Sequence, residues 1–368
     1  MIGPQGDRPT IPVLIGPFSG PVHGVSVINN ALAALLRERG VAFGILDLSP
    51  GRWRRGVLYH LTRASRTARA GLLMLAASFG APRRRYLMSL DGGSGLAYNI
   101  ALALIARTTG QAVTFYHHSS RYVLSDSSAI RFLLRISPGA PHVFCSRKMA
   151  ELFWQRYGDR GSTMIINNAA WIAPPAAPAP GAQAKTGKIR LGFLGALTAD
   201  KGVGRAIETL RTLLGRGMAA ELTLAGAPVE TSDRALLDRA GDEFGPALVR
   251  RGVLSGSSKR DFLLGLDYLL FPSLYAHETQ SLVVPEALAA GVPVIAIDHR
   301  FVGEILGDGG LLISPQGSFA EQAADWIAAG QDVHDERRIA ARRRFEAERQ
   351  QASGQLDRLI GWSLGGTG

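Results

Sequence analysis

The sequence predicts an α/β protein built from two doubly wound parallel sheets. Two observations lead to this fold class. Apolar segments of strand length alternate with segments of helical length, and a linker divides the alternation into two series. Alternation of this kind is typical of parallel sheets with helices on both faces. The 368 residues also provide the length of about two such domains.

The first series begins with the apolar segment IPVLIG at residues 11–16, followed by a loop rich in glycine and proline. A helix is then expected from about Val25 to Arg39, because apolar residues recur on one of its faces. These elements and the strands that follow predict an N-terminal domain of residues 1–172. The further strands are expected at residues 41–48, 84–90, 112–118, 142–146 and 164–168.

A linker separates the two series. The segment WIAPPAAPAPGAQAKTG at residues 171–187 is rich in Pro, Ala and Gly without periodicity, which indicates a domain boundary. The second series predicts a C-terminal domain of residues 187–345, and the chain from about Phe319 has a helical composition. Its strands are expected at residues 189–195, 221–226, 247–254, 268–273, 292–298 and 311–314.

Cysteine content and the N-terminal sequence bear on the compartment. The single cysteine, Cys145, excludes an internal disulfide and a cysteine metal cluster, so a reducing compartment fits. The N-terminus lacks the basic and apolar regions of a signal peptide. The apolar run at residues 70–81 is shorter than the roughly 20 residues of a membrane span. We therefore expect a cytoplasmic protein.

Residues 271–298, FPSLYAHETQSLVVPEALAAGVPVIAID, carry the most specific pattern. An apolar strand is followed by a loop, a short helix and a second strand of the kind that is buried on both faces. Glu278 is expected at the strand exit, and Glu286 early in the helix, whose first turn contains Pro285. Free backbone N–H groups around residues 279–283 would suit phosphate, and the carboxylates would accept from sugar hydroxyls. A nucleotide sugar fits this description.

This pattern resembles that of a known family. The two spaced glutamates, the PS before them and the EAL-x-x-GVPVIA after them look like the donor-site signature of retaining family 4 glycosyltransferases with the GT-B fold, of the bacterial polysaccharide type. The resemblance covers nearly the whole chain. It implies two Rossmann-like domains with a cleft between them, and a final helix at about 346–364 that crosses back onto the first domain.

The resemblance also implies roles in the second domain. Glu278 would contact the hydroxyls of the transferred sugar, Glu286 would bind the nucleotide ribose, and Lys201 would stabilise the leaving diphosphate from the start of a helix. The sequence departs from the family where Ala196 replaces an arginine, so a compensating cation would have to come from elsewhere. The remaining substrate-binding candidates are Gly195, Thr279, Gln280, Ser281 and Leu282, of which Thr279, Gln280 and Ser281 replace a Gly, aromatic, Gly sequence.

The first domain offers weaker candidates. Gly24 opens the first helix, and the resemblance implies that its loop approaches the donor phosphates, although any doubly wound domain has a glycine-rich first loop. His117 and His118 fall at the carboxyl end of a strand, where open parallel sheets bind ligands. The family often has a histidine there, so both are catalytic candidates. Adjacent strand residues point opposite ways, and the sequence leaves open which one faces the cleft. A turn-capping histidine beside an exposed one is the alternative.

The chain is basic, with 41 Lys and Arg against 30 Asp and Glu, which indicates anionic partners. The segment Arg52 to Arg85 contains nine arginines and no acid, with Trp53 and an LLML run interleaved. We expect this segment to attach the protein peripherally to an anionic membrane surface, where a polyprenyl-linked acceptor could be reached. A solvated basic surface is the alternative. Nucleic-acid binding is disfavoured, because no recognised binding module accompanies the charge.

The resemblance therefore predicts retaining transfer of a hexose from a nucleoside diphosphate sugar to the hydroxyl of a glycan or lipid-linked acceptor, in cell-surface or exopolysaccharide biosynthesis. No cofactor and no metal is expected, because the donor is a co-substrate and no Asp-x-Asp pair lies on a predicted loop. Two alternatives stay open. One is a sugar-nucleotide epimerase of the same fold. The other is a catalytically silent GT-B-like protein that binds a glycan or a partner enzyme, which the missing arginine at residue 196 would allow.

Overall fold

The computed structural model divides into two compact units. Unit 1 consists of residues 1–171 and 351–368, and unit 2 of residues 172–350. Residues 1–9, most of the linker, and Arg52, Trp53, Arg54 and Arg55 lie outside the described part of the chain. The structure describes residues 10–20, 23–51, 56–80, 83–159, 161–173, 187–330 and 332–366.

Unit 1 contains a six-stranded parallel sheet in the order β2-β1-β3-β4-β5-β6. The strands are β1 (Thr10–Gly16), β2 (Gly44–Asp47), β3 (Arg83–Leu90), β4 (Ala112–His117), β5 (His142–Phe144) and β6 (Thr163–Ile165). The helices are α1 (Gly24–Glu38), α2 (Val57–Ser78), α3 (Leu96–Thr108), α4 (Arg121–Leu124), α5 (Ser128–Ile136) and α6 (Arg147–Tyr157), with 3-10 turns at Gly93–Gly95 and Asn168–Trp171.

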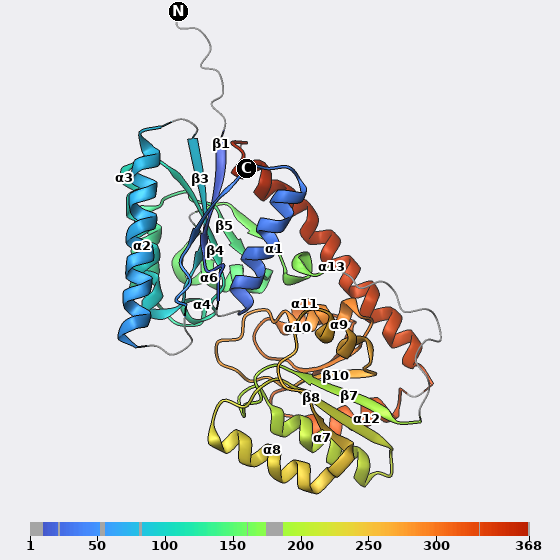
Figure 1. Ribbon diagram of the computed structural model, residues 1–368. Coiled ribbons are helices and arrows are strands. Elements are labelled where there is room, and N and C mark those ends of the chain that lie inside the picture. The colour runs from blue at the N-terminus through green and yellow to red at the C-terminus, as the bar shows by residue number, and fades with distance from the viewer. Residues whose placement is uncertain are drawn as a thin grey trace, which may run out of the picture. The chain divides into compact units, whose positions relative to one another are not determined.

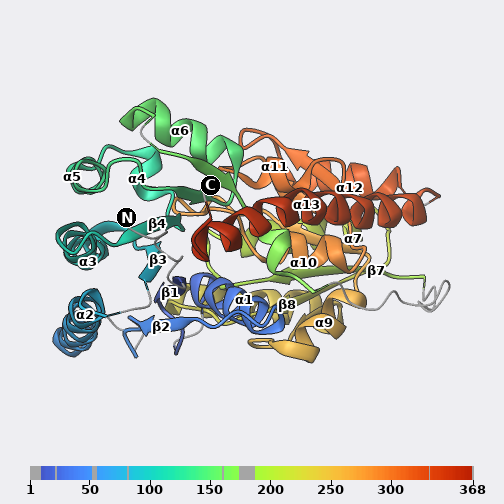
Figure 2. The ribbon, with the colours of Figure 1, turned by 90° about the horizontal axis from the view of Figure 1, so that it is seen from above.

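The helices of unit 1 form layers on its sheet. In Figures 1 and 2, α1 covers one face, whereas α2, α3 and α5 stand in a row on the other. Helix α1 begins where a capping box forms: the His23 ring accepts from the Ser26 N–H, and the Ser26 hydroxyl accepts from the His23 N–H at 3.0 Å. Ile28, Leu32 and Leu36 are buried on one side of this helix, as the apolar spacing in the sequence indicates.

Unit 2 contains a second six-stranded parallel sheet, in the order β12-β11-β10-β7-β8-β9. The strands are β7 (Ile189–Leu194), β8 (Ala220–Ala225), β9 (Leu248–Arg250), β10 (Tyr268–Phe271), β11 (Val294–Ile297) and β12 (Gly310–Ile313). The helices are α7 (Val203–Gly215), α8 (Thr231–Phe244), α9 (Gly256–Leu264), α10 (Val283–Ala289), α11 (Val302–Leu306) and α12 (Phe319–Ala328), with a 3-10 turn at Gly245–Ala247.

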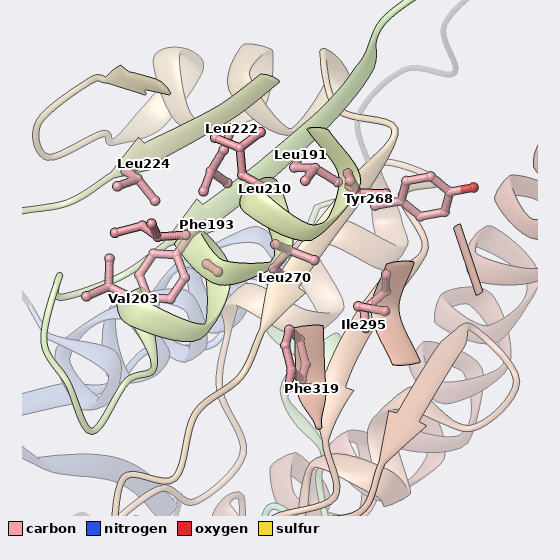
Figure 3. Packing of buried hydrophobic residues seen from close by; sticks show 14 of the residues in the cluster. Leu191, Phe193, Val203, Leu210, Leu222, Leu224, Tyr268, Leu270, Ile295 and Phe319 are labelled. Carbon is pink, nitrogen blue, oxygen red and sulfur yellow. The ribbon is translucent and has the colours of Figure 1, made fainter. Parts of the chain in front are cut away.

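The core of unit 2 lies between its sheet and helices α7, α8 and α12. Leu191 and Leu222 from the strands pack with Leu210 of α7 and Phe319 of α12, and all four side chains are buried (Figure 3). Central strands such as β10 and β11 are buried along their whole length because helices cover both faces of the sheet. Helices α9, α10 and α11 lie on the opposite face (Figure 1).

These observations confirm the predicted fold class. Each of the twelve expected strands is present, and all strand pairs are parallel. The last helix, α13 (His334–Ser363), begins in unit 2, and its residues from Gln351 onwards belong to unit 1. Within unit 1, Arg39 at the end of α1 forms an ion pair of 2.6 Å with Asp357 of α13.

The strand order of unit 2 reverses direction between β7 and β10, which are neighbours in the sheet. From β7 the chain proceeds outward to β8 and β9, and then returns to β10 on the other side of β7. Tyr268 of β10 pairs directly with Leu191 of β7. Ligands of open α/β sheets bind at such a switch point, beside the carboxyl ends of the two strands. The loops after β7 and β10 are therefore the part of the fold that can hold a ligand.

Gly202 sets the distance between these two loops. It precedes α7 in the left-handed backbone region, with a φ of 87°. A Cβ atom at this position would lie 2.2 Å from the carbonyl oxygen of Pro272, which follows β10. Only glycine accommodates both the backbone angle and this approach. The close contact places the neighbouring Lys201 beside the β10 loop.

We expect Gly202→Ala to lower the free energy of unfolding of unit 2 by at least about 2 kcal/mol, because it combines a strained backbone with a steric clash. Gly241→Ala is the matched control. Gly241 lies inside α8 with open space around its missing Cβ, so alanine there should stabilise the helix by about 0.5–1 kcal/mol. Thermal denaturation of both variants measures the difference. Equal melting temperatures would show that residue 202 does not hold the loops together.

Candidate functional site

Lys201 and Glu278 meet at the switch point of unit 2. The ammonium of Lys201 donates to Oε2 of Glu278 at 2.6 Å, and the two side chains are 25% and 10% exposed. The Lys201 Nζ also lies 4.5 Å from the centre of the Tyr275 ring, a cation-π contact. The expected position of Lys201 at the entrance of a helix is therefore observed, and its partner is the carboxylate that follows β10.

Glu278 is held from its own loop as well. The Ser273 hydroxyl donates to Glu278 Oε2 at 3.2 Å, and the Glu278 N–H donates to the Tyr275 carbonyl at 3.1 Å. The same carboxylate oxygen thus accepts from a cation and from a hydroxyl, which fixes the side chain in one orientation. A site of this kind can accept a hydrogen bond from a ligand hydroxyl and present a cation beside it.

Glu286 occupies the first turn of α10, as the sequence predicts, with Pro285 one residue before it. Its Oε1 accepts a charge-assisted hydrogen bond from the Lys259 ammonium of α9. Burial raises the pKa of the Glu286 carboxyl, and the Lys259 charge opposes that shift. Its Oε2 is buried and has no hydrogen-bond partner among the described residues. This oxygen is an unused acceptor in a confined position, where a ligand hydroxyl would offset its desolvation.

The loop between the two glutamates is partly enclosed. Gln280 is buried, whereas Thr279, Ser281 and Leu282 are half-buried. The Ser281 hydroxyl accepts from the Val283 N–H at 3.2 Å, which shapes the chain immediately before α10. Three of these four side chains are polar, and all four lie between β10 and α10.

Gly195 and Ala196 follow β7 directly. Gly195 has a φ of 151°, and its carbonyl oxygen would lie 1.7 Å from a Cβ on Gly226. The backbone of the β7 loop is therefore packed against the loop after β8. Ala196 is exposed, and no side chain at that position offers a positive charge.

In unit 1, His117 is part of the core. Its side chain is fully buried, its Nε2 lies 2.8 Å from Nδ1 of His142, and its ring stacks on Phe144 with centroids 4.1 Å apart. Burial lowers its pKa well below the ordinary value, with further contributions from His142 and His118. The ring lies among aromatic neighbours and presents no surface to a ligand. It therefore keeps a packing role in this structure.

His118 follows the last residue of β4, and its ring has a different neighbour from that of His117. It is half-buried, and its ring centre lies 4.1 Å from that of Tyr116. Burial lowers its pKa to about 3, and the charge of His23 contributes in the same direction. Both histidines are therefore neutral at pH 7, and His118 is the less buried of the two. Gly24 is exposed as the first residue of α1, next to His23.

Sequence reasoning missed two polar contacts. The first is the ion pair between Arg63 of α2 and Asp91, which follows β3; Arg63 Nη2 lies 2.5 Å from Asp91 Oδ2. Asp91 is the first polar residue after an apolar run, a signal that could have drawn attention to it. The second is the Lys259–Glu286 pair, for which the sequence contains no signal because the partners are 27 residues apart.

Two cavities of the described residues lie away from these groups. One of about 490 Å³ in unit 1 is lined by residues such as Gly110, Pro141 and Trp362. The other, of about 360 Å³ in unit 2, is lined by residues such as Arg190 and Arg251. Neither lining includes Lys201, Glu278 or Glu286.

The described residues contain no group of three or more His, Cys, Asp or Glu placed to hold a metal ion. No helix in the described part of the chain has both the length and the apolar character needed to cross a bilayer.

Comparison with known proteins shows the class of fold. The two parallel sheets with their helices match structures of GT-B glycosyltransferases, so the chain has the GT-B fold. Residues 188–329 match a family model described as glycosyl transferases group 1, and these residues include Lys201, Glu278 and Glu286. The curated proteins gave no match to the sequence.

Three solved structures illustrate the similarity. Anabaena HepE in complex with UDP and glucose is 14% identical, with a TM-score of 0.66 over 96% of this chain and 99% of its own. The pneumococcal O-GlcNAc transferase GtfA in complex with UDP and GlcNAc is 12% identical, with a TM-score of 0.62 over 81% and 59%. A trehalose-6-phosphate synthase, studied with bisubstrate glycomimetics for glycosyl transfer with retention, is 12% identical, with a TM-score of 0.62 over 95% and 98%.

Proposed function

We propose that this protein transfers a hexose from a nucleoside diphosphate sugar to an acceptor hydroxyl. The observation that carries the proposal is the Lys201–Glu278 pair at the switch point of unit 2. A cation and a sugar-binding acceptor stand side by side there, within the region that matches the glycosyltransferase family. UDP and glucose are bound by the similar Anabaena protein, which supports a nucleotide sugar as the donor.

Each residue has a task in this proposal. Lys201 binds the diphosphate and balances the negative charge that grows as it leaves. Glu278 accepts from hydroxyls of the transferred sugar, and the unused oxygen of Glu286 accepts from the ribose. Gly195 and the side chains of the β10 loop complete the donor site. In unit 1, His118 is the histidine that we assign to the sugar or phosphate, because His117 is enclosed in the core.

We infer that the transfer retains the anomeric configuration. In this reaction the bond between the sugar C1 and the departing phosphate oxygen breaks while C1 bonds to the acceptor oxygen on the same face. The acceptor proton passes to the departing phosphate oxygen, so no separate base is needed. The resemblance to family 4 enzymes and the retention studied in the similar trehalose-6-phosphate synthase support this course.

The acceptor in our proposal is a glycan on a polyprenyl lipid, and the setting is cell-surface or exopolysaccharide synthesis. The proposal is supported by the segment Arg52–Arg85, which contains nine arginines and no acidic residue; two of them, Arg63 and Arg66, pair with Asp91 and Asp47 outside the segment. Cations near an anionic leaflet are attracted by about 1 kcal/mol each. Peripheral attachment would bring the enzyme to a lipid-linked acceptor without a spanning helix.

Release of free nucleoside diphosphate distinguishes this function from its two alternatives. A transferase should release the diphosphate faster when an acceptor is added. An epimerase of the same fold should alter the donor sugar without dependence on an acceptor, and a silent binding protein should release nothing. We expect Lys201→Ala to lower turnover by roughly 10²–10³, as loss of one electrostatic stabiliser does.

Two further variants control that measurement. Lys201→Arg keeps a positive charge and should retain more turnover than Lys201→Ala. Lys188→Ala removes another lysine of unit 2, one that is exposed, and should leave turnover unchanged. Near-normal turnover of Lys201→Ala at saturating donor would contradict the role assigned to this residue.

Glu286→Ala should weaken donor binding, because a carboxylate that accepts from ribose hydroxyls contributes about 1.5–3 kcal/mol for each charge-assisted bond. Lys259→Arg is the matched control. It keeps a positive charge beside the Glu286 carboxylate, so donor affinity should stay near that of the wild type. Calorimetric titration with UDP-glucose measures both variants. The ribose assignment is wrong if Glu286→Ala binds the donor as tightly as the wild type.

A further inference from the structure

Helix α2 presents an apolar surface to solvent. Thr67, Ala70 and Met74 are buried on one side of the helix. Large apolar side chains are nevertheless exposed elsewhere on the helix. Val57 is 78% exposed, Leu72 is 67% exposed, and Phe79 just beyond the helix is 91% exposed. We call this surface the α2 outer face; its exposed large apolar residues are Val57, Leu58, Leu61, Leu72, Leu73, Leu75 and Phe79.

The α2 outer face extends along the helix in two groups of exposed apolar residues, one at Val57, Leu58 and Leu61 and one at Leu72, Leu73, Leu75 and Phe79. The helix has 22 residues, which at 1.5 Å each gives a length of about 33 Å. Val57, Leu61, Leu72 and Phe79 are separated by 4, 11 and 7 residues, spacings that keep side chains on one side of a helix. Figures 1 and 2 show α2 at the outer end of the row of helices on its face of the sheet. Single exposed apolar residues are ordinary, but an aligned series marks a site of interaction.

The charges of α2 are mostly engaged within unit 1. Arg63 pairs with Asp91, and Arg66 pairs with Asp47 at 3.0 Å. Arg85 after the helix donates to the carbonyl of Gly366 and lies over the ring of Trp362. Three of the nine arginines expected to contact lipid are therefore committed elsewhere. Arg69 and Arg83 remain exposed.

Charge argues against a second copy of the chain as the occupant. A two-fold dimer through α2 would place the same surface against itself. Arg69 and Arg83 of one copy would then face basic residues of the other, because residues 52–85 contain no acid. An anionic lipid surface has the complementary charge and an apolar interior, which match the exposed arginines and the apolar series.

We propose that the α2 outer face inserts into the interface of a bilayer that contains anionic lipid. Apolar side chains supply most of the attachment by leaving water, and Arg69 and Arg83 contact headgroups. Attachment of this kind differs from the charge-based attachment that the arginines alone suggest. Screening by salt weakens contacts between exposed charges, whereas burial of apolar surface in lipid persists in high salt.

Vesicle flotation tests this proposal. Wild type should float with vesicles of phosphatidylcholine and phosphatidylglycerol, and most of the bound fraction should persist at 1 M NaCl. The triple variant Leu61→Gln, Leu72→Gln, Phe79→Gln should bind at least tenfold less. A matched triple variant in unit 2, Val229→Gln, Val253→Gln, Ile339→Gln, changes equally exposed apolar residues and should float like the wild type. Unchanged melting temperatures confirm that the variants fold.

Three results would overturn the proposal. If wild type does not float with the vesicles at low salt, the protein has no membrane-binding surface. If the α2 triple variant floats like the wild type, the membrane-binding surface is not on α2. Sedimentation without vesicles gives the third. If wild type forms a dimer that the α2 variant cannot form, a second copy covers this face.

A separate observation concerns the donor site. Arg300 follows β11 and has a φ of 62°, which makes it the non-glycine residue with a left-handed backbone among the described residues. A side chain larger than that of asparagine is rare in this region and costs free energy. Its buried Nε also has no hydrogen-bond partner in the described part of the chain. Strain and an unsatisfied donor at one residue are typical of a position kept for a ligand.

Arg300 stands next to the groups that define the donor site. The neighbouring His299 lies 3.3 Å from the carbonyl oxygen of Tyr275, the residue whose ring contacts Lys201. Charges on Arg300 and Glu278 both act on the His299 ring. Strand β11 also pairs with β10, so its loop leaves the same edge of the sheet as the loop that carries Glu278.

We infer that Arg300 supplies the second cation for the donor diphosphate, in place of the side chain that Ala196 lacks. The inference rests on the proposed donor site. Lys201 is already paired with Glu278, so the pair carries no net charge and cannot by itself balance a diphosphate. A guanidinium with an unused N–H is suited to phosphate oxygens.

Substitution by glycine separates this role from a structural one. Arg300→Gly removes the backbone strain, so the melting temperature should rise by about 2–4 °C. The Kd for UDP should nevertheless increase at least tenfold, while the weak binding of uridine stays the same. Arg300→Lys keeps a charge and should lose less affinity for UDP. Arg234→Gly, at an exposed position of α8, should leave the Kd for UDP unchanged.

The outcomes distinguish the two proposals. If wild type binds no UDP, the donor site itself is wrong. If wild type binds UDP and Arg300→Gly binds it equally well, the donor site stands and Arg300 has no part in it.

Discussion

The close packing of the loops after β7 and β10 is the constraint on which the candidate site depends. A parallel sheet brings the carboxyl ends of adjacent strands to one edge, but it does not fix the distance between the loops beyond them. Here the carbonyl of Pro272 occupies the space where residue 202 would carry a Cβ. The helix entrance is thereby held against the β10 loop. Lys201 reaches Glu278 from a sequence separation of 77 residues because of that contact.

The polar groups of the site are held in strained or desolvated states that folding alone would not favour. Glu286 is buried with one oxygen unused, and Arg300 has a backbone angle that suits glycine. Such features cost stability, and the large apolar core of unit 2 offsets them. A ligand with phosphate and hydroxyl groups would relieve each of these costs at once.

Sequence reasoning recovered the fold because apolar runs mark buried parallel strands regardless of their partners. The edge strand β9 shows its limit. Eight residues were expected, yet only Leu248–Arg250 form the strand, since it pairs with β8 alone. The alternation of side chains along a strand also does not decide which of His117 and His118 is enclosed in the core. The aromatic residues that enclose His117, such as Phe144 and Phe153, come from other elements and become neighbours only in the fold.

Long-range pairs were equally hidden. Lys259 carries no motif, and nothing in the sequence connects it to Glu286. Helix α2 is apolar on more than one side, so its sequence does not reveal which side the sheet covers. The departure at Ala196 could be read directly, whereas the backbone strain at Arg300 could not.

Crystallography with bound UDP tests the central claim most directly. Our account predicts density for the diphosphate beside Lys201 and Arg300 in unit 2, with the ribose hydroxyls at Glu286. Density for UDP in another part of the chain, with the Lys201–Glu278 pair unchanged and solvent at the switch point, would contradict it.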